Sequence, residues 1–264
     1  MSKRGVYLLY SAVLIAFTIL LGFDCGLAGT LNFQPQSLER TLFSKRFNDL
    51  TISGPTPEGC QIILKIVAPN QEFKLNKSGK GLGLIWLPIG HAEVKNIPGM
   101  YALLSSAKIS AILSKEDQQA TGLCSDFKEI YQLAKIHHKK NPREEEAAGL
   151  NREYVSGLIK ILIEKKLYQN KEGTVAVAGG QFKAQLLHPV DGPLGEYRVS
   201  CYAIKDGKVR LLTEDGFSVK SSGLGDWLYR QAVVNAVVYG ILAALMAIGA
   251  GLFVGVIFKK GGGH

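Results

Sequence analysis

The sequence predicts a mainly β protein with a helical insert (an α+β arrangement), built from one or two immunoglobulin-like sandwiches and a single C-terminal membrane span. Short β-rich segments that end at Gly, Pro or Asn flank a central helical stretch, and residues 236–258 contain no charged side chain. Hydrophobic residues make up 47% of the 264 positions, and only four are cysteines. This composition excludes collagen-like, disordered and disulfide-framework proteins.

Residues 1–28 have the layout of a signal peptide. A basic start precedes an uncharged apolar run over residues 6–22, and the small residues at 26–28 suit a signal peptidase. The run is slightly long for a cleaved signal and slightly short for a hydrocarbon core of about 30 Å. We expect cleavage after Ala28, and a retained N-terminal anchor is the alternative.

Residues 29–113 form the first β-rich block. Residues 61–67 are rich in β-branched side chains and are followed by a Pro-Asn turn. Further short apolar or alternating segments follow at 73–75, 82–87, 92–94 and 101–104. We expect Pro88 and Gly90 to end the second of these segments. Short strands with such ends are typical of an antiparallel sandwich.

Residues 114–170 form a helical block. Asp126, with Glu129 three residues later, predicts one helix start, and the Asn-Pro pair at 141–142 before a run of acids predicts a second. Asn151 can cap a further helix. The apolar positions of that helix recur at helical spacing: Val155, Leu158, Ile159 and Leu162. We expect this face to cover a sheet, and a separate binding helix is the alternative.

Residues 171–226 form the second β-rich block. Apolar and polar side chains alternate over residues 182–186 and 197–203, as in half-buried strands. Residues 205–208 read Lys-Asp-Gly-Lys and predict a tight hairpin, because Asp-Gly tolerates the positive φ values of a primed turn.

The two β-rich blocks share one local feature. Tyr101 and Tyr197 each stand two residues after a glycine, at the entry to a predicted strand. A tyrosine at such an entry resembles the tyrosine corner of immunoglobulin-like sandwiches. Two sandwiches, or one sandwich split by the helical block, both fit this pattern.

Residues 227–260 hold a membrane anchor. The uncharged stretch at 236–258 is long enough to cross a hydrocarbon core of about 30 Å. Residues suited to the membrane interface stand on both sides of it: Trp227, Tyr229, Arg230, Lys259 and Lys260.

Both ends of the chain place cations beside an apolar segment. The basic pairs are Lys3–Arg4 and Lys259–Lys260, and no acidic residue lies before Asp24 or after Asp226. The positive-inside rule puts both pairs on the cytoplasmic face, so residues from about 29 to 230 lie outside. In a bacterial cell this predicts an inner-membrane protein whose main domain lies in the periplasm. That location argues against a nucleic-acid partner, despite a net charge of +9.

Small residues recur along the predicted span. Ala243, Ala247, Gly251 and Gly255 are spaced four apart, and the last two form a G-x-x-x-G motif. Such a stripe lets another helix approach closely, so we expect contact with another integral membrane protein or with a second copy. The general abundance of glycine and alanine in membrane helices is the alternative explanation.

No residue spacing in the chain predicts a catalytic, metal or cofactor site. His137 and His138 are adjacent, so on a helix they point about 100° apart and suit a solvated basic helix end. Residues 79–83 contain G-x-G-x-G without the strand–turn–helix context of a phosphate site, so we expect a loop between strands. We therefore expect a protein that is not an enzyme. An envelope enzyme with a site assembled from distant residues is the alternative.

Cysteine usage leaves two alternatives open. If cleavage removes Cys25, the remaining cysteines are Cys60, Cys124 and Cys201. The periplasm is oxidising, so one expectation is a disulfide with one buried thiol. The other is three unpaired thiols packed as small hydrophobic side chains.

Two basic clusters, each in a predicted loop, are the candidate binding surface: Lys74, Lys77 and Lys80, and then Lys139, Lys140 and Arg143. Clustered cations attract an anionic ligand, a partner or lipid head groups. Ordinary solvated side chains are the alternative interpretation.

Several segments resemble a known family in their order along the chain: residues 83–86, 97–101, 105–106, 195–197 and 206–207, followed by the anchor. The chain is similar in this respect to a family of transmembrane proteins described mainly from alphaproteobacteria. The resemblance implies one exported β-rich domain with one anchor, and an association with sulfite exporters of the TauE/SafE type. It brings no catalytic residues. The lysines at 74, 77 and 80 stand where the family leads us to expect arginines.

These observations lead to two functional hypotheses. The first is a non-catalytic, membrane-anchored periplasmic accessory protein that docks to another membrane protein through the small-residue stripe and an exposed sandwich edge or loop. The alternative is a periplasmic ligand-binding module that passes a sulfite-like oxyanion to a permease by means of the lysine clusters.

Overall fold

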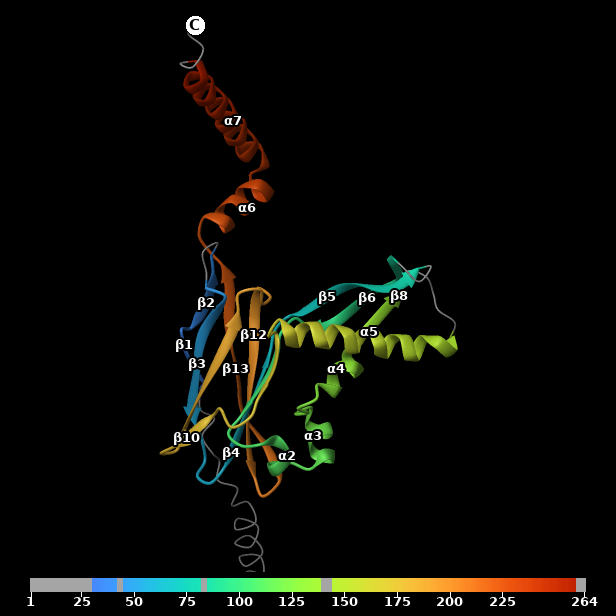
Figure 1. Ribbon diagram of the computed structural model, residues 1–264. Helices are drawn as coiled ribbons and strands as arrows, with labels where there is room; N and C mark the ends of the chain where they lie inside the picture. The colour runs from blue at the N-terminus through green and yellow to red at the C-terminus, as the bar shows by residue number, and fades with distance from the viewer. Residues whose placement is uncertain (1–29, 42–44, 82–84, 139–143, 260–264) are drawn as a thin grey trace, which may run out of the picture.

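The computed structural model describes residues 30–41, 45–81, 85–138 and 144–259, and two facing sheets form its centre (Figure 1). One sheet has the order β1 (Asn32–Gln34), β3 (Phe47–Pro55), β11 (Gln181–Pro189), β10 (Ala176–Ala178). The other has the order β2 (Ser37–Arg40), β13 (Lys208–Ser221), β12 (Gly195–Lys205), β4 (Gln61–Val67), β7 (Tyr101–Ser105), β9 (Tyr168–Lys171). The rings of Phe33 and Phe217, one from each sheet, have centroids 5.8 Å apart. The core therefore lies between the two sheets, as in a β-sandwich.

Strands from both β-rich blocks pair within the same sheets, so the chain contains one split sandwich. β3 pairs with β11, with Ile52 opposite Ala184, and β4 pairs with β12, with Leu64 opposite Cys201. All four side chains are buried. The β4 segment is almost wholly apolar because it lies inside its sheet and is covered on both faces.

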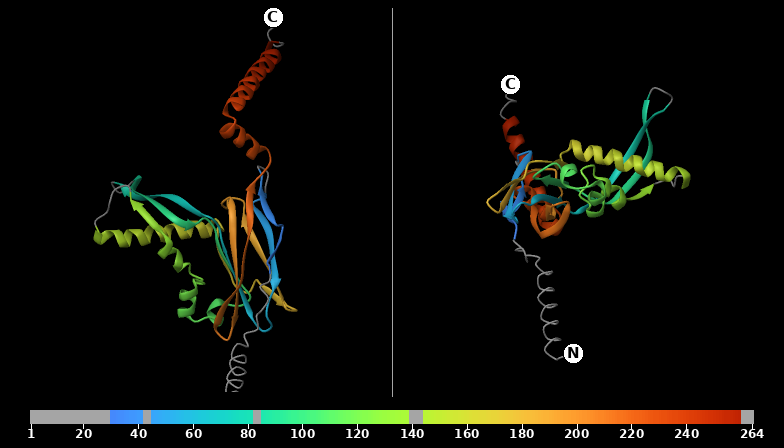
Figure 2. Two further views of the ribbon diagram at one scale, coloured as in Figure 1. Left: turned by 180° about the vertical axis from the view of Figure 1, so that it is seen from behind. Right: turned by 90° about the horizontal axis from the view of Figure 1, so that it is seen from below.

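A third sheet projects sideways from the sandwich together with a long helix (Figures 1 and 2). It consists of β5 (Asn70–Gly81), β6 (Ile85–Pro98) and β8 (Lys135–His138), and the helix is α5 (Glu144–Glu164). We call these four elements the arm. The sequence predicted short sandwich strands over residues 73–94, and this was wrong: the segment forms two long strands that leave the sandwich.

The predicted strand end at Pro88 and Gly90 was also wrong, because β6 continues through both residues. The pairing shifts register there, with Lys77 opposite Gly90 but Ser78 opposite Pro88, so Ile89 is an extra residue on β6. Such a bulge is one of the few places where a strand accommodates proline.

Three short helices connect the arm with the sandwich: α2 (Ile109–Ile112), α3 (Lys115–Thr121) and α4 (Lys128–Leu133). The Ser114 hydroxyl caps α3 by accepting a hydrogen bond of 3.1 Å from the Asp117 backbone N–H. Asp126 Oδ1 accepts one of 3.3 Å from the Lys128 N–H, at the helix start that the sequence predicted.

Two local predictions for the helical block were wrong. His137 and His138 lie in β8 rather than at a helix end, because their backbone pairs with Glu93 and Ala92 of β6. Asn151 lies inside α5 and starts no helix, and its Oδ1 is 2.6 Å from His138 Nε2. At the histidines, pairing with a distant strand outweighs the local helix signal, whereas at Asn151 the helix has already begun at Glu144. The predicted Asn-Pro cap lies outside the described residues.

The apolar face of α5 covers a sheet, as predicted. Its four predicted positions, Val155, Leu158, Ile159 and Leu162, are all buried. The helix contacts β5 and β6 of the arm and β9 of the sandwich, so it holds the arm against the rest of the domain.

The predicted hairpin and one tyrosine corner are confirmed. Lys205 pairs with Lys208, and the two residues between them have φ values of 51° and 74°. The Tyr197 hydroxyl donates a 2.8 Å hydrogen bond to the Pro193 carbonyl oxygen, which is the geometry of a tyrosine corner. The Tyr101 hydroxyl instead donates to Gly122 O of the helical block, so the similarity between the two tyrosines is local only.

The chain leaves the sandwich at one end through two helices, α6 (Leu224–Val234) and α7 (Ala236–Lys259) (Figure 1). At this end the Ser222 N–H donates a 2.9 Å hydrogen bond to Arg40 O of β2. β3 runs away from this end, and Asn32 of β1 pairs with Ser53 near its finish. The described chain therefore starts toward the far end of the sandwich. The predicted signal segment at residues 1–28 lies outside the described residues.

Candidate functional site

The helix α7 is exposed over residues 236–256. Residues Ala236–Val256 have a mean hydropathy of 2.4, and none of this segment is buried within the protein. Its 21 residues extend about 32 Å at the usual helical rise, which matches a hydrocarbon core of about 30 Å. Among the described residues, it is the one helix that is long and apolar enough to cross a membrane, in agreement with the sequence.

The small residues predicted to contact another helix all lie on α7. Ala243, Ala247, Gly251 and Gly255 are spaced four apart and therefore follow one side of the helix. A Cβ atom added at Gly251 or Gly255 would meet no atom within 4 Å, so this side is open. Its contact with a partner helix stays a prediction.

The first lysine cluster lies in strand β5 rather than in a loop. Lys77 Nζ is 2.7 Å from Glu153 Oε2 on α5, and Lys74 Nζ is 4.0 Å from Glu93 Oε1 on β6. Lys80 lies near the end of β5. The second cluster lies outside the described residues: Lys139, Lys140 and Arg143. Lys74 and Lys77 thus each have a carboxylate nearby, and an anionic ligand for the two clusters stays a prediction.

The outward face of the arm's sheet has a shallow hollow of about 480 Å³. Polar side chains that share this face line it: Lys74, Asn76, His91, Glu93 and His137. His91 Nδ1 is 2.7 Å from Asn76 Oδ1, so the two side chains hold each other. The hollow carries one lysine and one glutamate, so these two opposite charges offset each other.

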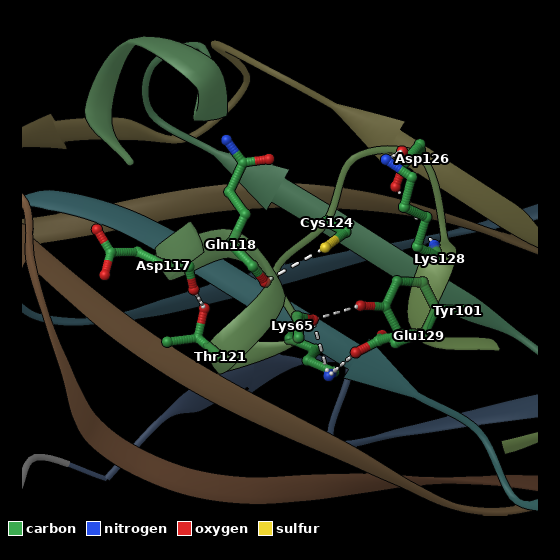
Figure 3. Close-up of polar contacts among 10 residues, drawn as sticks. Lys65, Tyr101, Asp117, Gln118, Thr121, Cys124, Asp126, Lys128 and Glu129 are labelled. Atoms are coloured by element: carbon green, nitrogen blue, oxygen red, sulfur yellow. Dashed lines mark hydrogen bonds and ion pairs between the residues drawn. The ribbon is translucent and has the colours of Figure 1, made fainter. Parts of the chain in front are cut away.

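A charged cluster joins the helical block to the sandwich (Figure 3). Lys65 Nζ donates hydrogen bonds of 2.9 Å to Glu129 Oε2 and 3.0 Å to the Gly122 carbonyl oxygen. The Tyr101 hydroxyl donates to the same carbonyl at 3.2 Å, and Lys65 Nζ lies 5.5 Å from the Tyr101 ring centroid. Burial, followed by the Glu129 charge, raises the pKa of Tyr101, so the phenol stays protonated and acts as a donor. We call these four residues the Lys65 cluster.

Sequence reasoning missed the Lys65 cluster, although one signal was present. Lys65 is the one charged residue in the apolar segment 61–67, and a cation there must find a partner when the strand is buried. The side chains of Lys65 and Glu129 are only 19% and 16% exposed. Glu129 follows Lys65 by 64 residues, so no local sequence pattern connects the two side chains. The two charges neutralise each other, so we assign the cluster a structural role.

A second buried polar pair sits within the sandwich. His188 Nε2 lies 2.9 Å from the Tyr197 hydroxyl, whose own proton is donated to Pro193 O. Nε2 therefore carries a proton and donates to the phenol oxygen, which fixes the neutral tautomer of the ring. His188 Nδ1 is buried without a partner, and burial lowers the pKa of His188 to about 4.

The described cysteines are all free, so the structure has the arrangement with three unpaired thiols. Cys60, Cys124 and Cys201 are each buried. Burial raises the pKa of Cys201 to about 12 and also raises that of Cys124, so these two thiols stay protonated and are poor nucleophiles. Within the described ranges, no group of three His, Cys, Asp or Glu side chains is arranged to hold a metal ion.

Over the described residues, the fold and the exposed helix define a class of protein: a β-sandwich domain with a projecting arm and one C-terminal helix that is long and apolar enough to cross a membrane. Residues 46–260 match the family described as "Putative transmembrane protein (Alph_Pro_TM)", and the chain belongs to this family. No curated protein and no solved structure matches the chain.

Proposed function

We propose that this protein is a non-catalytic accessory protein of the bacterial inner membrane, with its sandwich and arm in the periplasm, and that it docks to another integral membrane protein. One observation carries the proposal. The apolar helix α7 is wholly unburied within the chain and has an open stripe of small residues, while a second potential contact surface, the arm, projects from the anchored domain (Figure 2). Two attachment surfaces on one chain suit a protein that holds another in place.

The proposed orientation rests on charge at the ends of α7. The sandwich precedes α7 and Lys259 ends it, so a spanning α7 puts the two on opposite sides of the membrane. Cations prefer the cytoplasmic side, which favours a periplasmic sandwich. The basic pair at Lys3–Arg4 favours the same orientation.

The first docking surface is the small-residue stripe. Without bulky side chains at Gly251 and Gly255, a partner helix backbone can approach α7 closely, and packing drives association in lipid. Replacing either glycine by leucine fills this approach. Gly249→Leu is a matched control, because Gly249 lies about 200° around the helix from Gly251 and its added Cβ atom also meets open space.

Blue-native electrophoresis of membranes dissolved in a mild detergent tests this docking. We expect the wild-type chain to migrate in a complex, Gly251→Leu and Gly255→Leu to release it as a monomer, and Gly249→Leu to leave the complex intact. A wild-type chain that migrates as a lone monomer would contradict the proposal. Identification of the co-migrating chains separates a second copy from a different membrane protein.

The second docking surface is the outer edge of β5. The arm's sheet has the order β5–β6–β8, so among the described strands β5 has a neighbour on one side only. Unpaired strand edges accept extended partner segments, and lysines on an edge discourage indiscriminate pairing. Lys74 is 82% exposed on this strand and fits that second role.

The oxyanion-binding alternative has one observation in its favour, which is the hollow that contains Lys74, His91 and His137. Glu93 lies 4.0 Å from Lys74 and weakens any attraction for an anion. Titration calorimetry of the full chain in detergent with sulfite, sulfate and a sulfonate tests this alternative. Heat of binding that Lys74→Ala abolishes would support it, and the absence of heat with all three anions would exclude it.

A further inference from the structure

The helix α6 is separate from the membrane span and changes direction relative to it (Figures 1 and 2). Its helical hydrogen bonding ends at Asn235, which has φ −119° and ψ 50°, and α7 begins at the next residue. The 21-residue span within α7 already matches the thickness of the hydrocarbon core. α6 therefore lies at the level where the hydrocarbon core meets the lipid head groups, on the side of the membrane that carries the sandwich.

The two charged side chains of α6 share one side of the helix, and mostly apolar or aromatic side chains, with Gln231 among them, make up the rest. Asp226 and Arg230 are one turn apart on the same side, and Arg230 Nε donates to Asp226 Oδ2 at 2.8 Å. The apolar and aromatic side chains around them are 37–75% exposed: Trp227, Leu228, Tyr229, Val233 and Val234. At about 100° per residue, Leu228 lies opposite the charged pair, with Trp227 and Tyr229 on its flanks, whereas the two valines lie beside the charged pair. Three large exposed side chains on the side away from the charges are costly in water and need a cover.

We propose that α6 lies flat in the membrane surface, with Leu228 toward the acyl chains and the Asp226–Arg230 pair toward water. Three observations indicate that lipid covers the apolar surface. α6 continues directly into the span, its position coincides with the head-group level, and Trp227 and Tyr229 lie about 100° to either side of Leu228, where aromatic rings reach the lipid boundary. This proposal depends on α7 spanning the membrane, but neither on a docking partner nor on which side is the periplasm.

A flat α6 also fixes the sandwich relative to the lipid. Only Gly223 separates the helix from Ser222, and Ser222 is bonded through its N–H to Arg40 O and through its hydroxyl to Glu39 Oε2 of β2. So short a connection transmits the position of α6 to the first strands of the sandwich. The sandwich is therefore held at a set height above the bilayer rather than on a loose tether.

Tryptophan fluorescence of the full chain in phosphatidylcholine vesicles tests this proposal. The chain has two tryptophans, so Trp86→Phe leaves Trp227 as the one reporter, and Trp86→Tyr is a second background if the first does not fold. The matched control carries a tryptophan at Leu211, which is 49% exposed on β13 near the hairpin farthest from α6, with both natural tryptophans replaced by phenylalanine. Lipids with bromine near the head group or deep in the acyl chains act as quenchers.

We expect the emission of Trp227 to shift to the blue and to lose intensity with brominated lipids, more with shallow than with deep bromines. Aqueous iodide should quench it less than it quenches the control at position 211. Quenching of Trp227 by iodide as strong as that of the control, with no loss to either brominated lipid, would overturn the proposal. If complexes with a partner protein dissolve in the Gly251→Leu variant but the lipid quenching remains, the lipid contact stands without the docking.

Discussion

Lys65 on β4 and Glu129 on α4 form an ion pair of 2.9 Å between a central strand of the sandwich and the helical block. Both side chains are largely buried, and the Lys65 ammonium also binds Gly122 O at the end of α3. Because a buried charge without its partner is costly, this pair helps to fix the position of the helical block on the sandwich.

Lys65→Met should destabilise the protein by about 2–3 kcal/mol, because it leaves the Glu129 carboxylate buried without its cation. Urea unfolding of the full chain in detergent measures the change. Lys77→Met is the matched control: Lys77 and Glu153 are 34% and 58% exposed, so losing that pair should cost no more than about 1 kcal/mol. Equal losses for the two variants would contradict the structural role of the Lys65 cluster.

Stability should fall in mild acid because of His188. Its pKa is lowered from 6.5 to about 4 by burial, so between these values the unfolded chain binds the proton more readily than the folded protein. The stabilisation is present above pH 6.5 and is lost as the pH falls toward 4, by up to about 3 kcal/mol. Urea unfolding of the wild type and of His188→Leu at several pH values in this window separates the contribution of His188 to the pH dependence of stability from that of the carboxylates. An identical slope in both proteins would contradict it.

Tyr197→Phe should cost more stability than Tyr101→Phe. The first change removes the bond to Pro193 O and leaves the buried His188 Nε2–H without an acceptor, for a loss of about 2–3 kcal/mol. The second removes one bond of 3.2 Å to Gly122 O, for a loss of about 1 kcal/mol. In a His188→Leu background the cost of Tyr197→Phe should shrink, since no donor is then left unpaired. A cost that does not change in that background would argue against the tautomer deduced for His188.

The mature protein should begin at Gly29. Asn32 lies toward the end of the sandwich away from α6, so a retained N-terminal span would have to reach the same bilayer back along β3. When fully extended, residues 23–31 span at most about 30 Å, which limits how far a retained N-terminal span could lie from Asn32. Intact-mass measurement of the protein purified from membranes shows which form is present. A mass that includes residues 1–28 would show that the segment is retained.

Much of the sandwich and the anchor could be predicted because their signals are local. The Asp-Gly hairpin, the apolar strand at 61–67 and the uncharged span at 236–258 each carry their pattern within one segment, and the structure confirms all three. The tyrosine corner at Tyr197 also depends on a bond to a residue only four positions away.

The arm and the buried polar contacts could not be predicted because they depend on distant partners. Pro88 would normally end a strand, but the bulge between Pro88 and Gly90 lets β6 continue. His137 suits a helix end in the sequence, but in the structure it pairs with Glu93 of a neighbouring strand. Lys65 appears as an isolated cation in a strand, because Glu129 is 64 residues away. The candidate contact residues on α7 follow from spacing alone, and their contact with a partner helix stays a prediction. The lysines of β5 were placed in the wrong kind of element.

Paired reporter fusions show on which side of the membrane the sandwich lies. Alkaline phosphatase, which needs the oxidising exterior to fold, is inserted between Asp206 and Gly207 at the exposed hairpin tip, and green fluorescent protein is fused after His264 in a second chain. We expect an active phosphatase at the hairpin and a fluorescent protein at the C-terminus. An inactive phosphatase at the hairpin, with phosphatase activity gained when it is moved to the C-terminus, would instead place the sandwich inside the cell.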